Sequence, residues 1–121
     1  MTKNTYEIHA RIYSFVLSVL NVIQYIPKTI ENIELIRQLV RAAASIGANA
    51  SEADSAESRK DFIHKFTIAK KEAQECSYWL SLLSDHNGKI KTKFVSLLEE
   101  NRQLIAIIST IILNSKRNSR R

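Results

Sequence analysis

Apolar residues recur along this chain at alternating spacings of three and four, which is the period of an amphipathic helix. In the first such segment the apolar positions are Ile8, Ile12, Phe15, Val19, Val22 and Ile26. A later segment repeats the spacing at Phe62, Phe66, Ala69, Ala73, Cys76, Leu80 and Leu83. Each row would lie on one face of its helix, so each predicts one seam of a helical bundle.

Local signals divide the chain into four helices. Pro27 ends the first helix because proline cannot donate a backbone hydrogen bond, and Thr29 can cap the second. Ser58, with Asp61 three residues later, resembles a capping box before the third helix. The third helix closes at 87–88, where we expect Gly88 to take the left-handed conformation.

These boundaries predict helices over about residues 5–26, 30–53, 59–86 and 92–116, followed by a basic tail at 116–121. Their lengths match well enough for side-by-side packing, and no segment has the pattern of a strand. We therefore predict an all-α fold, an antiparallel up-down four-helix bundle, with residues 1–121 forming a single domain.

The second helix is nearly free of large side chains between residues 42 and 51, so another helix can approach it closely. Its apolar stripe is predicted at Ile33, Ile36, Val40, Ala43, Gly47 and Ala50. A polar line on one helix face consists of Arg41, Ser45, Asn49 and Glu52. We expect this line to form a hydrogen-bonded network with Glu72 and Glu75 of the third helix, which would fix the register of the bundle.

Two helices carry more apolar surface than one bundle core needs. The first has a second stripe, Val16, Leu17, Leu20 and Ile23, and in the fourth only Ser109 and Thr110 interrupt the apolar run 104–113. A helix that is apolar on most faces must be buried on most faces. The excess therefore predicts a homo-oligomer without fixing its number of subunits, and an apolar monomer is the alternative.

Composition and charge narrow the class of protein. The single Cys76 excludes an internal disulfide and suits a reducing cytoplasm, which is where we expect the protein. The apolar stretch 13–26 is too short and too polar to cross a membrane. The net charge is +6, but four basic residues lie in the last six positions, so residues 1–115 carry 14 Lys and Arg against 12 Asp and Glu, or +2.

Basic side chains suggest contacts with nucleic acid. Lys60, His64, Thr67 and Lys71 fall within about 60° of one another on the third helix and form a narrow strip. The predicted contact residues are Lys60, His64, Lys71, Lys116, Arg117, Arg120 and Arg121. Because no aromatic residue lies between these lysines, we expect binding to the phosphate backbone and not to the bases.

Little in the sequence indicates catalysis or a cofactor. The three histidines occupy unrelated helical positions, and the motif Asp61-x-x-His64 occurs only once, so we predict no metal, no cofactor and no small-molecule substrate. Cys76 lies on an apolar seam and is predicted to be a core residue. Glu72 and Glu75 are expected to pair with basic groups, most simply Arg41, and not to act as an acid and a base.

One short motif is the basis of an enzymatic alternative, a nuclease. Arg59 and His64 fit the R-x4-H spacing of the RNA-cleaving HEPN domains, in which an Arg and a His act on the scissile phosphate. Lys60 stands where that motif often has a polar amide. The alternative is that Arg59 binds Asp54 or Glu57 at the turn and that His64 lies on the solvated face.

Two longer motifs resemble a known family. The first reads Gln38-Leu39-x-Arg41-Ala42-Ala43-x-Ser45-Ile46-x-x-Asn49-x-x-Glu52-Ala53. The second is Lys60-Asp61-Phe62 followed by Ile68-Ala69-x-Lys71-Glu72-Ala73-x-Glu75-x-x-Tyr78-Trp79-Leu80. Over roughly residues 6–115 the chain resembles the bacterial 23S rRNA intervening-sequence proteins, small four-helix bundle proteins of which some are called ribosomal proteins. Gly47 departs from the proline or serine that this family often has.

The resemblance implies an up-down four-helix bundle that assembles as a ring, usually a homopentamer, and that associates with RNA. We therefore expect a cytoplasmic, non-enzymatic scaffold or adaptor whose partners are copies of itself and RNA or an RNA-associated protein. A HEPN-like ribonuclease that uses Arg59 and His64, and a purely structural protein–protein interaction module, are the alternatives.

Overall fold

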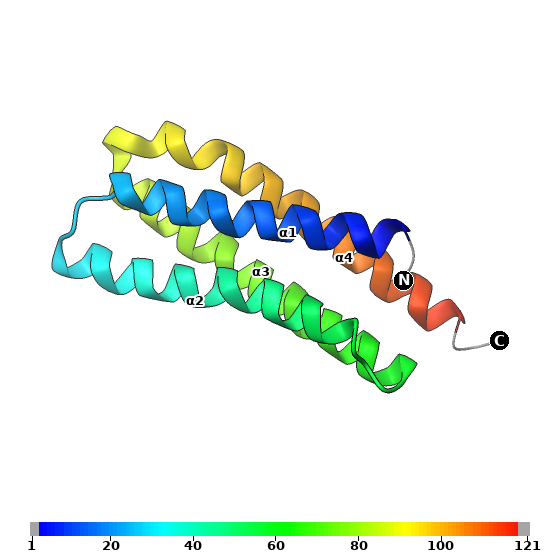
Figure 1. Ribbon diagram of the computed structural model, residues 1–121. Helices are drawn as coiled ribbons and strands as arrows, with labels where there is room; N and C mark the ends of the chain where they lie inside the picture. Colours follow the sequence, from blue (N-terminus) through cyan, green and yellow to red (C-terminus); the bar gives the residue numbers. More distant parts are fainter. Residues whose placement is uncertain (1–2, 119–121) are drawn as a thin grey trace.

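The computed structural model describes residues 3–118, and within them the chain forms four long helices and no strand (Figure 1). The helices are α1 (Lys3–Val22), α2 (Ile30–Ala53), α3 (Arg59–His86) and α4 (Val95–Asn118). Two short 3-10 helices, η1 (Ile23–Tyr25) and η2 (Gly88–Phe94), follow α1 and precede α4. Successive helices run in opposite directions, so the start of α1 and the end of α4 lie at the same end (Figure 1). The predicted all-α four-helix architecture is confirmed.

Two of the predicted helix starts are fixed by side-chain caps. Thr29 Oγ1 accepts a hydrogen bond from the backbone N–H of Asn32 at 3.2 Å. Ser58 Oγ likewise accepts from the backbone N–H of Asp61 at 3.0 Å. Each oxygen satisfies one of the backbone donors that a helix leaves free in its first turn, so the helix begins where the sequence places it.

Helix α3 ends at His86 as predicted, but the conformation that ends it differs from the prediction. No glycine among the described residues has a positive φ, so Gly88 does not take the left-handed conformation. Asn87 ends the helix instead: its backbone N–H and its side-chain amide both donate to the carbonyl oxygen of Leu83, at 3.0 and 2.9 Å. With that carbonyl satisfied, the chain continues directly into η2, and α4 begins at Val95, later than the predicted residue 92.

The seams predicted for the first and third helices form the centre of the bundle. All six predicted positions, from Ile8 in α1 to Ile26 directly after η1, are buried. In α3 the row from Phe66 to Leu83 is buried throughout, and Phe62 is half-buried at its start. The alternating spacing of three and four thus identified the inward faces of both helices.

The stripe predicted for the second helix is only partly right. Ala43 and Ala50 are buried as predicted, whereas Ile33 is exposed and Ile36, Val40 and Gly47 are half-buried. The other buried apolar positions along the helix are Leu39, Ala42, Ile46 and Ala53, which the predicted stripe does not include. The reason is that α2 packs most closely on α3, which turns its buried face toward these residues and leaves Gly47 facing Ile12 of α1.

The fourth helix buries most of its apolar surface within the bundle, contrary to the predicted excess. Leu104, Ile108, Ile111 and Ile112 are buried, and only Leu113 of the run 104–113 is an exposed large apolar residue. Because α4 lies between α1 and α3, its apolar residues reach both neighbours. Within residues 3–118 no helix is both long and apolar enough to span a membrane.

Candidate self-association and nucleic-acid surfaces

The outer face of α1 is apolar and uncharged. Tyr13, Leu17 and Leu20, spaced by four and three, are 69%, 46% and 40% exposed. The stretch 12–27 contains no charged residue, although a quarter of the chain is charged. Of the predicted second stripe, Leu17 and Leu20 are exposed and Val16 and Ile23 are half-buried. No residue in the part of the chain that the structure describes covers this row, so it is the clearest candidate for an interface.

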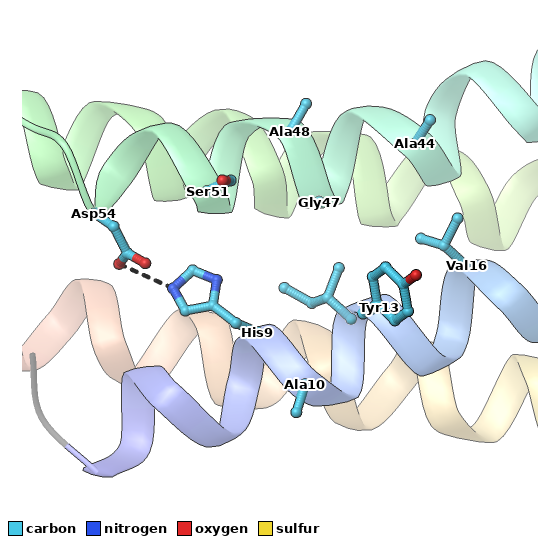
Figure 2. A pocket seen from close by; sticks show the side chains of 10 residues that line it. His9, Ala10, Tyr13, Val16, Ala44, Gly47, Ala48, Ser51 and Asp54 are labelled. Carbon is cyan, nitrogen blue, oxygen red and sulfur yellow. Dashed lines mark hydrogen bonds and ion pairs between the residues drawn. The ribbon is translucent and has the colours of Figure 1, made fainter.

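A groove of about 690 Å³ runs beside this row, between α1 and α2 (Figure 2). The wall formed by α2 consists of small residues, Ala44, Gly47, Ala48 and Ser51. His9, Tyr13 and Val16 reach toward it from α1 (Figure 2). The groove ends where His9 Nε2 lies 2.9 Å from Asp54 Oδ1, a contact that joins the start of α1 to the end of α2.

The polar line of α2 meets α3 at a cluster of charges. Arg41 Nη1 lies 3.4 Å from Glu72 Oε2, and Arg41 Nη2 lies 3.8 Å from Glu75 Oε1. Burial raises the pKa of Glu72, and the hydrogen bond and negative charge of Glu75 raise it further, while Ser45 and Arg41 oppose the shift. The structure therefore brings Arg41, Ser45, Glu72 and Glu75 together.

The other two residues of the predicted network lie elsewhere. Asn49 Nδ2 donates to the backbone oxygen of Ser45 in its own helix at 2.9 Å. Glu52 Oε1 lies 3.2 Å from Lys65 Nζ. The reason is the antiparallel register of α2 and α3, which places Glu72 and Glu75 opposite Arg41 and the earlier Lys65 opposite Glu52.

The interior offers no reactive thiol. Cys76 is buried, and burial together with the negative charges of Glu72 and Glu75 raises its pKa to about 12. The thiol is thus protonated at neutral pH, which suits a core residue. No group of three or more His, Cys, Asp or Glu side chains that could hold a metal is found among the residues that the structure describes.

The two residues of the nuclease motif diverge. Arg59 and His64 are five positions apart on α3, which separates their side chains by about 140° around the helix. Arg59 Nη1 donates to the backbone oxygen of Ser115 at 3.5 Å, and not to Asp54 or Glu57 as the sequence suggested. The end of α4 supplies that acceptor, while His64 is exposed on a different face.

The predicted basic strip is exposed, as Lys60, His64, Thr67 and Lys71 all face solvent. The contact between Arg59 and Ser115 places the end of α4 beside the start of α3. Lys116 and Arg117, both exposed, therefore lie at the same end of the bundle as Lys60. Arg120 and Arg121 lie outside the described residues.

A second basic group, at the opposite end, was not identified from the sequence. It consists of Lys28, Lys89, Lys91 and Lys93. Here an aromatic residue does accompany the lysines: Lys93 Nζ lies 4.0 Å from the centre of the Tyr25 ring. The alternation Lys89-x-Lys91-x-Lys93 was a visible signal, but Tyr25 precedes it by more than sixty residues, and only the fold brings the two together.

The family model of the 23S rRNA-intervening sequence protein matches residues 4–110. The chain belongs to this family. It is similar to a crystal structure of a protein with unknown function from the S23 ribosomal protein family of Bacteroides thetaiotaomicron VPI-5482. That similarity has a TM-score of 0.82 and 29% identity, and it covers 90% of this chain and 97% of the other. No curated protein matches the chain.

In this member of the 23S rRNA-intervening sequence family, the two motifs lie on α2 and α3 and meet at the cluster of Arg41, Glu72 and Glu75. The motifs therefore supply contacts that hold two helices in register. The related crystal structure is that of a protein with unknown function, so the activity must be argued from the surfaces of this chain.

Proposed function

We propose that this member of the family is a non-enzymatic scaffold that associates with copies of itself and holds RNA by its phosphate backbone. The observation that carries self-association is the uncharged outer face of α1, where Tyr13, Leu17 and Leu20 are exposed in the isolated chain. The centres of protein interfaces are depleted in charged residues in the same way. Burying this row between copies removes its apolar surface from water.

The shape of the surface supports a ring. The large side chains of Tyr13 and Leu17 project from α1 beside a groove whose α2 wall consists of small residues. The projecting row of one copy can therefore enter the groove of the next copy, so that each contact joins two different surfaces. Contacts of this type close into rings when the rotation between copies allows it. A ring of five is the number that the family resemblance implies.

RNA binding is the second part of the proposal. Lys60, His64 and Lys71 form an exposed strip on α3, and Lys116 and Arg117 lie at the same end. Few phosphate contacts per chain give weak binding, but copies in one assembly act together and raise the affinity by avidity. An RNA-associated protein could bind the same assembly. Ribonuclease activity gains no support, because the side chains of Arg59 and His64 point in different directions.

Light scattering on the native chain and on Leu17→Glu tests self-association. We expect an oligomer for the native chain and a monomer for the variant, because the new carboxylate would be buried in an uncharged contact. Ile30→Glu is the matched control, since Ile30 is almost fully exposed at the start of α2 and its variant should remain oligomeric. A native chain that is monomeric at micromolar concentration would contradict the proposal.

RNA binding is tested by measuring affinity against salt concentration. For single-stranded RNA, each lost phosphate contact lowers the slope of log K against log salt by about 0.7. Lys60→Gln combined with Lys71→Gln should therefore lower that slope, whereas Arg37→Gln, which removes an exposed charge from α2, should not. RNA affinity that does not depend on salt would rule out binding through the backbone.

A further inference from the structure

The exposed half of α1 has a second, polar side. Its residues are Ser14, Ser18, Asn21 and, in η1, Tyr25, which are spaced by four, three and four. They line a groove of about 500 Å³ whose other wall, from η2 and α4, includes Lys93, Ser96 and Glu100. This groove lies on the α4 side of α1, away from the apolar groove beside α2. Its volume is within the range of small-ligand sites.

Tyr25 stands at one end of this groove and is 61% exposed. The ammonium group of Lys93 lies over one face of its ring, 4.0 Å from the ring centre. An exposed cation–π contact of this kind contributes about 0.5–1 kcal/mol, whereas a base stacked on an aromatic side chain contributes about 1–3 kcal/mol. Stacking of a nucleic-acid base on the Tyr25 ring therefore contributes more than the contact with Lys93. A base can displace both water and the Lys93 ammonium group from the face of the ring.

The lysines around Tyr25 differ in what they already bind. Lys28 Nζ donates to the carbonyl oxygens of Ile23 and Ile26, at 2.7 and 2.6 Å, and Lys91 Nζ lies 3.5 Å from Asp85 Oδ1. Lys93 contacts only the Tyr25 ring among the interactions of the described residues, and Lys89 is exposed beside Pro27. Of these lysines, Lys93 lines the groove and is thus the cation best placed for a phosphate.

The opposite end of the groove is lined by Glu100, whose carboxylate is paired with Arg11, with Arg11 Nη2 2.6 Å from Glu100 Oε1. This guanidinium is therefore already engaged, whereas the Lys93 ammonium group has no carboxylate partner among the described residues. A ligand is thus expected to lie with its phosphate near Lys93. Between the two ends, the hydroxyl and amide groups of Ser18, Asn21 and Ser96 can both donate to and accept from a base edge or a ribose 2′-hydroxyl.

We propose that Tyr25 and Lys93 bind one unstacked nucleotide of single-stranded RNA, with the base on the Tyr25 ring and its phosphate beside the Lys93 ammonium group. The choice of RNA as the ligand rests on the proposed function, but the site does not use the α3 strip. The strip ends at Lys71, well before the end of α3 at His86, so the two surfaces are separated by at least about 20 Å along the helix. RNA that reaches one surface need not reach the other.

The test uses the assembled native protein and fluorescein-labelled octauridine, with affinity measured by fluorescence anisotropy. Tyr25→Ser should weaken binding at least fivefold, the lower limit for one lost base–aromatic stack, and Tyr25→Phe should retain it. Tyr78→Ser is the matched control, because Tyr78 on α3 is 62% exposed, and it should bind like the native chain. Lys93→Gln should lower the salt slope by about 0.7. Thermal melting of each variant shows that it is folded.

Three outcomes would overturn this inference while leaving the proposed function intact. They are equal affinity of native protein and Tyr25→Ser for octauridine, an equal loss in Tyr25→Phe and Tyr25→Ser, and binding of duplex RNA through the α3 strip with no binding of octauridine. Cross-links from 4-thiouridine RNA to the peptide that contains Tyr25 would support the site. If the native protein binds neither RNA, the RNA part of the proposed function fails, and this inference fails with it.

Discussion

The side-chain amides of Asn32 and Asn87 donate hydrogen bonds to each other. Asn32 Nδ2 lies 2.8 Å from Asn87 Oδ1, and Asn87 Nδ2 lies 3.0 Å from Asn32 Oδ1. Asn32 is buried and also donates to the backbone oxygen of Pro27 at 2.9 Å. One pair of side chains thus joins the connection between α1 and α2 to the end of α3.

Replacing Asn32 by alanine should lower the free energy of unfolding by about 1–3 kcal/mol, because it removes the hydrogen bonds of a buried amide and leaves the half-buried Asn87 side chain without this partner. Urea denaturation followed by circular dichroism measures the change. Asn114→Ala, at an exposed position of α4, is the control and should change stability by less than about 0.5 kcal/mol. Equal stability of the two variants would show that the amide pair contributes nothing.

Asn101 is a second buried amide, between α3 and α4. Its Nδ2 donates to the backbone oxygen of Ala73 at 2.7 Å and to Ser77 Oγ at 2.8 Å, while its Oδ1 has no hydrogen-bond partner. Asn101→Ala should cost about 1–3 kcal/mol, since it removes these bonds and leaves a cavity. Asn101→Leu should cost less, because it fills the space and removes the unsatisfied oxygen. Urea midpoints in the opposite order would contradict this account.

Gly47 is not required by the packing of the chain itself. A Cβ atom at this position would meet only Ile12 Cγ2, at 3.6 Å, which is an ordinary van der Waals distance. Because glycine weakens a helix interior, Gly47→Ala should raise the free energy of unfolding by about 0.5–1 kcal/mol. The measurement is a urea titration at a protein concentration low enough to keep both proteins monomeric. A destabilised variant would mean that the space between Gly47 and Ile12 is too small for a methyl group.

Glu72 should make stability depend on pH. Because its pKa is raised in the folded protein, the native state binds more protons than the unfolded chain between the two pKa values, and the free energy of unfolding falls as pH rises through that interval. Glu72→Gln has no such proton to lose, so it should be more stable than the native chain at pH 7. The difference should disappear near pH 3.5, where both forms are neutral.

Urea midpoints of native and Glu72→Gln proteins at the two pH values measure this effect. Glu57→Gln makes the same change of charge at an exposed site and is the control for a general effect of net charge. If Glu72→Gln is less stable than the native chain at pH 7, the attraction between Arg41 and Glu72 outweighs the cost of burying the carboxylate.

Much of the fold could be predicted because large apolar residues mark an inward face. The rows of α1 and α3 contain Phe15 and Phe66, whose burial leaves no doubt about the orientation of each helix. In α2 the small residues around Ala43 carry little hydrophobic signal, so the predicted stripe included Ala43 and Ala50 correctly but missed Leu39 and Ile46. The apolar outer face of α1 could also be predicted, since Leu17 and Leu20 exceed what the inward seam requires.

The contacts that join distant segments could not be predicted in the same way. The pair Asn32–Asn87 links the first turn of α2 to the residue after α3, and the pair Tyr25–Lys93 links η1 to η2. Their geometry depends on where two turns meet in space, and helix periodicity carries no information about that. Glu52 was misplaced for a related reason, because its partner depends on the register between α2 and α3.

Because the bundle has an even number of antiparallel helices, its two ends differ. One end carries the start of α1 and the end of α4, and the other carries the α1–α2 and α3–α4 connections (Figure 1). Rotational symmetry would give every copy in a closed assembly the same orientation, so all termini would be equivalent and distinct from all turns. A label fused to either terminus would then lie on one face of the assembly only, and the two faces of the ring would differ.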